Sequence, residues 1–130
     1  MRYETIVAFL SGDLLPESLA AEIEVEVATH RMELKASAAG YVHAAKGPDF
    51  VVDRSGARRL LHALDRGQLS FNAATYIADC LTMSEPFEFA DDATRDAIFF
   101  LEDDTPRFVS GNEDWQPSRD EILQALAALD

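Results

Sequence analysis

The sequence predicts an all-α fold, a compact bundle of five or six helices in one domain over residues 1–130. Three observations lead to this prediction. Apolar residues recur at steps of three and four along most of the chain, which is the spacing of one helix face. Ser, Asp or Pro precedes these apolar runs, and Gly or Pro follows them after short links. With 48% hydrophobic residues in a chain of 130, one core can form.

The first two helices are predicted from apolar spacing. Ile6, Phe9 and Leu10 place the first helix, which we expect to end at Gly12, a residue suited to helix C-termini. A second helix should begin near Pro16, because proline is favoured in a first turn. Its apolar line consists of Leu15, Leu19, Ile23, Val27, Leu34, Ala38, Tyr41 and Ala45.

Helix-breaking and helix-capping residues mark the ends of the elements in the middle of the chain. Gly47-Pro48 ends the second helix, and Phe50-Val51-Val52 follows as a short extended segment. Either Asp53 or Ser55 then caps a third helix, because both have a side-chain oxygen that accepts a backbone N–H. This third helix closes at Gly67.

The remaining helices have similar start signals. Ser70 caps a fourth helix, which Ser84-Glu85-Pro86 breaks, and the alternating Phe87-Glu88-Phe89 predicts a second extended segment. Asp91 or Asp92 caps a fifth helix.

The last part of the chain carries the clearest helix start. Thr105-Pro106 ends the fifth helix, and residues 107–109 are a third candidate for a short extended segment. Ser110-Gly111-Asn112 indicates a turn. Ser118-Arg119-Asp120-Glu121 then fits a capping box, in which the serine and the glutamate satisfy each other's backbone N–H groups.

The net charge of the chain limits the classes of partner that we expect it to bind. Twenty-four acids against eleven bases give a formal charge of −13. Nucleic-acid backbones and anionic membrane surfaces require clustered Lys and Arg, so we expect neither as a direct partner. A basic protein surface is the natural complement of such a charge. The plainer alternative is that the charge only keeps the protein in solution.

Other features of the sequence indicate a cytoplasmic protein. A single cysteine, Cys80, excludes a disulfide framework and a Cys-based zinc site. The longest uncharged stretch, residues 67–78, is too short to cross a bilayer. The first residues, with an acid at Glu4, have no signal-peptide pattern.

The acids are concentrated in the last third. Residues 1–40 hold seven acids and three bases (−4), residues 41–82 four and five (+1), and residues 83–130 thirteen and three (−10). Several of these acids fit helix caps. Glu102, Asp103 and Asp104 do not, because the helix dipole disfavours acids at a helix C-terminus.

Acids at a helix C-terminus, where the dipole disfavours them and no compensating contact is evident, indicate a functional surface. Neighbouring acids and a tryptophan extend the cluster, since aromatic residues among acids suit a protein interface. The same aromatic residues also suit the core. The predicted partner-binding residues are Glu85, Glu88, Glu102, Asp103, Asp104, Glu113, Asp114 and Trp115.

Catalytic and metal motifs are weak. The sequence has no Gly-rich phosphate loop, HExxH, nucleophile elbow or EF-hand loop, so we expect no enzyme and no cofactor. Glu22, Glu26, His30 and Glu33 share one helix flank, as carboxylate metal sites require, but no second helix supplies a matching motif. Because His30 also falls on the apolar line, a partly buried histidine hydrogen-bonded to a neighbour is the favoured interpretation.

From about residue 53 onward, the chain resembles a family of small bacterial proteins. The resemblance rests on leucine, glycine and acid patterns. They are Arg58-Arg59-Leu60-Leu61, Gly67-Gln68-Leu69-Ser70, Tyr76-Ile77-Ala78-Asp79, Phe87-Glu88-Phe89, Ile98-Phe99-Phe100-Leu101 and the capped last helix. This resembles the small helical immunity proteins of bacterial toxin systems, similar to colicin D immunity protein. The resemblance implies a helical protein whose acids dock into the basic active-site cleft of a cognate toxin, often an RNase.

The leading hypothesis is therefore an immunity or antitoxin-like inhibitor that binds a basic protein through acids in its last third. A structural or adaptor helical domain is the first alternative. A helical carboxylate metalloprotein built on Glu26, His30 and Glu33 is the second.

Overall fold

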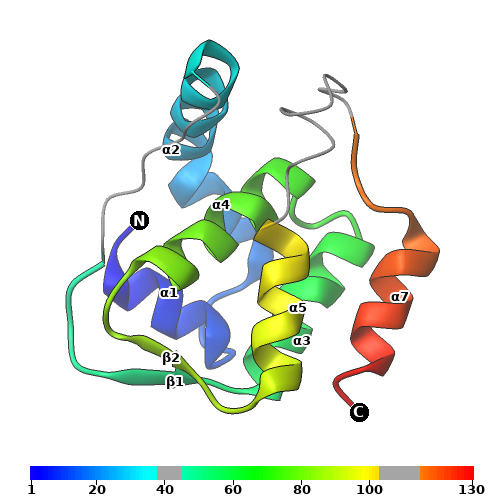
Figure 1. Cartoon of the computed structure of the whole chain (residues 1–130). Coiled ribbons are helices and arrows are strands. Elements are labelled where there is room, and N and C mark those ends of the chain that lie inside the picture. The colour runs from blue at the N-terminus through cyan, green and yellow to red at the C-terminus, as the bar shows by residue number, and fades with distance from the viewer. Residues whose placement is uncertain (38–44, 103–114) are drawn as a thin grey trace.

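The computed structural model describes residues 1–37, 45–102 and 115–130 (Figure 1). In this part of the chain the fold is a bundle of six helices with one short strand pair, which confirms the predicted all-α class. The helices are α1 Tyr3–Leu10, α2 Pro16–Ser37, α3 Arg54–Asp65, α4 Phe71–Met83, α5 Asp92–Glu102 and α7 Arg119–Ala127, and the strands are β1 Phe50–Val52 and β2 Phe87–Phe89. The segment predicted as extended at 107–109 and the predicted turn at 110–112 lie outside the described residues.

Four helices begin at side-chain caps that the sequence predicts. In each, a side-chain oxygen accepts the backbone N–H of the residue three positions later, which satisfies a helix donor that has no intrahelical partner. Asp53 caps α3 in preference to Ser55, and Ser118 forms the complete capping box with Glu121. The caps are Asp53, Ser70, Asp91 and Ser118.

Two helices end at glycines in the left-handed region. Gly12 follows α1 with φ 86°, and Gly67 follows α3 with φ 71°. The N–H of each glycine donates to the carbonyl three residues earlier, and the next N–H donates to the carbonyl five residues earlier. This pairing is the Schellman motif, and it satisfies carbonyl groups that the helix end leaves open.

The described part of α2 ends at Ser37, and Ala38 and Tyr41 of its predicted apolar line lie outside the described residues. The prediction that this helix continues through Ala45 is wrong, because Ala45 is buried outside any helix. Its N–H donates to Ser84 Oγ at 3.1 Å, which ties this part of the chain to the end of α4. Leu15 is also not a core residue, since it is 69% exposed. Leu19 and Ile23 are buried as expected.

The two predicted extended segments form one parallel strand pair. Phe50 lies opposite Phe87, and Val52 lies opposite Phe89. The Phe50 N–H donates to the Pro86 carbonyl at 2.8 Å, and the Ala90 N–H donates to the Val52 carbonyl at 2.9 Å. Since α3 and α4 come between the strands, this pairing joins distant parts of the chain.

Helix α4 lies at the centre of the bundle, between α2 and α5 (Figure 1). Ten of its thirteen residues are buried. Its closest packing is against α5, and the Thr75 hydroxyl donates to the Leu101 carbonyl at 3.0 Å across that contact. Burial on nearly every side explains why α4 has an apolar sequence with few charges.

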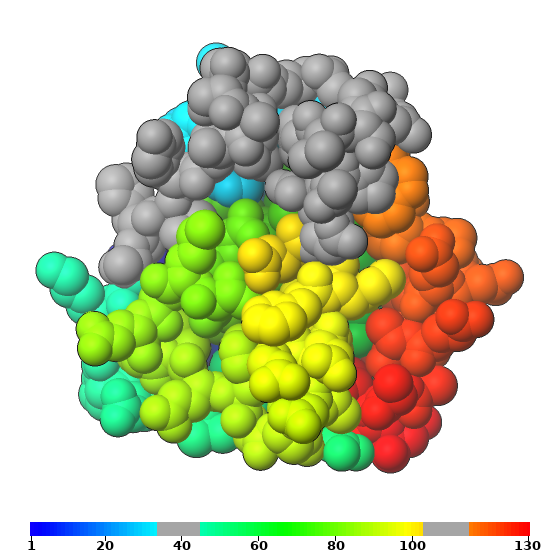
Figure 2. Space-filling view, viewed as in Figure 1, coloured from blue at the N-terminus to red at the C-terminus, as the bar shows by residue number. Residues whose placement is uncertain are grey.

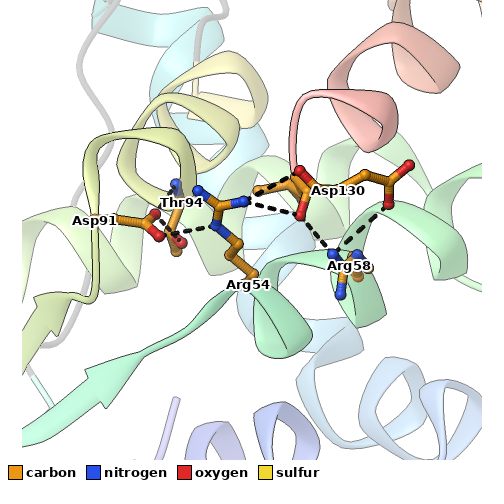
Figure 3. Close-up of polar contacts among 6 residues, drawn as sticks. Arg54, Arg58, Asp91, Thr94 and Asp130 are labelled. Carbon is orange, nitrogen blue, oxygen red and sulfur yellow. Dashed lines mark hydrogen bonds and ion pairs between the residues drawn. The ribbon is translucent and has the colours of Figure 1, made fainter.

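Arginines at the start of α3 connect three elements (Figure 3). Arg54 Nε donates to Asp91 Oδ2 at 2.8 Å, and its Nη1 lies 3.3 Å from the backbone oxygen of Asp130. Arg58 donates to the Leu129 carbonyl and lies 3.6 Å from Asp130 Oδ1. The starts of α3 and α5 and the chain after α7 are thereby held together.

Replacing Asp91 by Ala should destabilise the protein at neutral pH and much less in acid. The Thr94 backbone N–H, the Thr94 hydroxyl and Arg54 lower the pKa of Asp91 from 3.8 to about 2. A lowered pKa stabilises the folded state above the unfolded value of 3.8, and this stabilisation is lost as the pH falls through about 2. The difference in urea midpoint between wild type and Asp91→Ala should therefore shrink across this interval.

The variant Asp91→Asn is the matched control. Asparagine keeps an oxygen for the Thr94 N–H and loses only the negative charge facing Arg54. It should lie between wild type and Asp91→Ala at neutral pH. A difference that stays constant down to about pH 2 would contradict this role of Asp91.

Candidate functional site

The structure places half of the predicted partner-binding residues. Glu85 and Glu88 are exposed at β2 and the turn before it, Glu102 is half-buried at the end of α5, and Trp115 is half-buried before α7. Four of the predicted residues lie outside the described part of the chain. They are Asp103, Asp104, Glu113 and Asp114.

The described members of this set do not form one cluster. Strand β2 precedes α5 and Glu102 ends it, so Glu88 and Glu102 lie about one helix length apart, roughly 16 Å for eleven residues. The Trp115 ring packs edge-to-face on Phe71, with ring centroids 5.7 Å apart, at the start of α4. The predicted residues therefore occupy both ends of α5.

The outer surface of α5 connects these two ends. Asp92 and Asp96 have side chains that are 88% and 71% exposed. Phe99, one turn further on, is 46% exposed and contacts the half-buried Phe89 of β2 with ring centroids 6.3 Å apart and planes at 73°. Figure 2 shows α5 in yellow at the centre of this face, between the β2 region and α7.

We call this surface the acidic face. The name covers the exposed acids of α5, of β2 and of the turn before it, together with the edge-to-face pair that joins β2 to α5: Glu85, Glu88, Phe89, Asp92, Asp96 and Phe99. Arg95 is its cation and lies 3.4 Å from Asp92 and 3.8 Å from Asp96. Exposed ion pairs of this kind are weak, about 0–1 kcal/mol, so these carboxylates can exchange partners.

Sequence reasoning did not place Asp92, Asp96 and Phe99 in the interface. Asp92 is predicted only as a possible helix cap. The available signal was their spacing of four and then three residues, which puts all three on one side of a helix. That spacing alone does not tell which side faces water.

The acidic flank of α2 is divided among separate contacts. Glu22 accepts hydrogen bonds from Thr5 Oγ1 at 2.7 Å and Arg2 Nη2 at 2.9 Å, which lower its pKa. Glu26 accepts from the Tyr76 hydroxyl at 2.8 Å. Among the described residues, no group of three or more His, Cys, Asp or Glu is arranged to hold a metal ion.

His30, on the apolar line of α2, is buried. Its Nε2 lies 3.1 Å from Asp79 Oδ2 on α4, and its ring lies edge-on to the Tyr76 ring at 5.1 Å. A buried imidazole paired in this way joins α2 to α4. His30 thus has a polar partner, as predicted, but it is buried and not partly buried.

The cysteine beside this pair is unsuited to nucleophilic chemistry. Cys80 is fully buried, and burial raises the pKa of its thiol to about 11. Burial is also the main reason that the pKa of Tyr76 is raised. A neutral thiol away from water is a poor nucleophile, because the thiolate is the reactive form.

Comparisons with known proteins add no family. No protein-family model matches the chain, and neither a curated protein nor a solved structure does. None of the described helices has the length and apolar character that crossing a bilayer requires.

The His30–Asp79 pair should behave as one coupled unit in folding. Replacing either residue alone by Leu leaves the other polar group buried without its partner, which costs about 1–3 kcal/mol. The double replacement removes both polar groups, so its loss of unfolding free energy should be smaller than the sum of the single losses. Urea unfolding of the four proteins measures this coupling. Strictly additive losses would show that the two side chains act independently.

Proposed function

We propose that this protein is an immunity or antitoxin-like inhibitor that binds a basic surface of a partner protein through its acidic face. The observation that carries the proposal is the contact of the exposed Phe99 with the half-buried Phe89, with the exposed Asp92 and Asp96 on the same side of α5 as Phe99. Binding hot spots combine an aromatic anchor with a surrounding polar rim. The formal charge of −13 favours a cationic partner.

Two further considerations support this function. The resemblance of residues 53–130 to small helical immunity proteins implies the same kind of partner, a toxin with a basic active-site cleft. Glu102, at the end of α5, adds a carboxylate to the same helix, while Asp103 and Asp104 of the predicted set lie outside the described residues. A cytoplasmic location is part of the proposal, since such an inhibitor must meet the toxin where the toxin acts.

The test of the function class is co-expression with the product of the adjacent open reading frame. That product alone should arrest growth, and co-expression with this protein should restore it. A neighbour that is harmless, or toxicity that this protein does not relieve, would contradict the proposal.

The acidic face is tested by neutralising Glu88, Asp92 and Asp96 as Gln, Asn and Asn. Association with the partner should slow about tenfold at low salt, because charges at an interface rim mainly accelerate encounter. The difference should nearly vanish near 1 M salt, where the screening length falls to about 3 Å. Stopped-flow association rates at several salt concentrations measure both effects.

The matched control removes three exposed acids from α1, the following turn and α2. These are Glu4, Asp13 and Glu24, which are exposed and do not belong to the acidic face. Both triple variants have the same net charge, so only the position of the lost charges differs. Equal slowing by the two variants would assign the effect to overall charge and not to the acidic face.

Self-association through α5 and α7 is the second candidate, as expected of an adaptor domain. It is favoured by exposed apolar side chains on both helices, Phe99 on α5 and Leu123 on α7. Sedimentation of the wild type and of Phe99→Ser and Leu123→Ser separates the two functions. A stable dimer that both replacements dissociate would favour the adaptor.

A further inference from the structure

A cleft of about 480 Å³ lies between α3 and the turn that joins α1 to α2. Its volume falls within the range of small-molecule sites, about 300–1,000 Å³. One wall is a face of α3, and the other contains Gly12, Leu14 and Leu15. The cleft shares no residue with the acidic face.

The charge of this cleft is opposite to that of the chain. Arg58, Arg59, His62 and Arg66 line it, and none of the described lining residues is Asp or Glu; the nearest carboxylate contact is at its edge, where Glu17 accepts a hydrogen bond from the lining Gln68 at 3.2 Å. The chain as a whole has 24 acids and eleven Lys and Arg. A cleft lined by arginines without carboxylates is therefore a local exception that favours an anion.

Two of these arginines are available to a ligand. Arg58 is committed to Leu129 and Asp130 at the far side of α3. Arg59 and Arg66 are exposed and form no ion pair with any described residue. They lie seven residues apart, so their Cα atoms are about 10 Å apart along the helix, with His62 between them.

The backbone holds Arg59 in place across the cleft. Its guanidinium lies over Gly12, where an added Cβ would come within 2.6 Å of Arg59 Cζ. Gly12 has φ 86°, which favours glycine independently of this contact. The absence of a side chain at position 12 therefore lets the guanidinium lie against the turn.

The cleft also has an apolar wall. The Phe9 ring is buried at its base, and Leu14 and Leu15 line its side. Leu15 is 69% exposed, although it belongs to the apolar line of α2. An exposed leucine beside exposed guanidinium groups suits a ligand with an apolar body and an anionic head.

We propose that this cleft binds a small organic anion, with its phosphate or carboxylate head held by Arg59 and Arg66 and its apolar body against Leu14 and Leu15. The planar guanidinium donates two parallel hydrogen bonds to either head group. This site is independent of the proposed inhibitory function, because it uses other residues and another surface. Either assignment can fail while the other holds.

The experiment is a calorimetric titration of the full chain with four probes: inorganic phosphate, phenyl phosphate, phenylacetate and a hexaglutamate peptide. Phenyl phosphate or phenylacetate should bind saturably with Kd at or below about 1 mM, and more tightly than inorganic phosphate. The better of the two phenyl probes identifies the head group. Tighter binding of hexaglutamate than of either would overturn the proposal in favour of a peptide groove, and no saturable binding would overturn it outright.

Three variants locate the site. Arg59→Gln and Arg66→Gln should each lower the affinity for the better phenyl probe about tenfold, since a hydrogen bond to a charged group contributes that much. Arg95→Gln removes an equally exposed arginine from α5 and should leave the affinity unchanged. Equal weakening by Arg95→Gln would show general charge attraction and would contradict the site. Leu15→Ser should remove most of the advantage of the phenyl probe over inorganic phosphate.

A pair of glycine variants separates position from stability. Gly12→Ala and Gly67→Ala both introduce a side chain at positive φ, at a similar cost of roughly 1 kcal/mol in unfolding free energy. An added Cβ displaces Arg59 at Gly12 and meets nothing within 4 Å at Gly67. Only Gly12→Ala should therefore lower the affinity for the phenyl probe. Thermal unfolding verifies that both variants fold. Equal affinities in the two variants would contradict the placement of Arg59 in the site.

Discussion

The burial of α4 imposes a hydrogen-bonding requirement that positions the helices around it. Thr75, Tyr76 and Asp79 are buried on this helix and need partners away from water. Each finds one on a neighbour: the Leu101 carbonyl of α5, and Glu26 and His30 of α2. A buried polar group without a partner costs about 1–3 kcal/mol, so sliding α2 or α5 by one turn would be unfavourable. Apolar packing alone would tolerate such a shift more readily.

This arrangement also determines which side of α5 faces solvent. Ala97, Ile98 and Leu101 pack towards the core, so Asp96 and Phe99 must face outward. Local rules therefore predicted the helices and their caps, because a cap depends on residues three positions apart. They did not predict the parallel pairing of Phe50 with Phe87, or the pairing of His30 with Asp79, because these partners are distant in sequence. For the same reason, Ala45 fitted an apolar line that the helix does not follow.

The arginines of α3 form two groups: some have partners within the fold, and others are exposed to a ligand. Arg54 and Arg58 hold Asp91 and the residues after α7, whereas Arg59 and Arg66 face the cleft beside Gly12. Exposed charges interact weakly beyond about 8 Å at physiological salt. A cleft whose charged lining residues are arginines can therefore remain locally positive on a protein of charge −13. A negative net charge therefore does not exclude a small anion at this position.

Asp91 and Asp92 show why the acids of the last third cannot be assigned from sequence. Both are plausible caps for the same helix, but only Asp91 accepts the Thr94 N–H and pairs with Arg54. Thr94 and Arg54 stabilise the ionised carboxylate of Asp91, and its pKa is lowered as a result. Asp92 is one residue further and 88% exposed, so its charge is directed to solvent and to any partner. Under the proposed function, Asp92 and Asp96 therefore contribute more to binding than the total charge does, because they share one side of α5 with Phe99, which contacts Phe89.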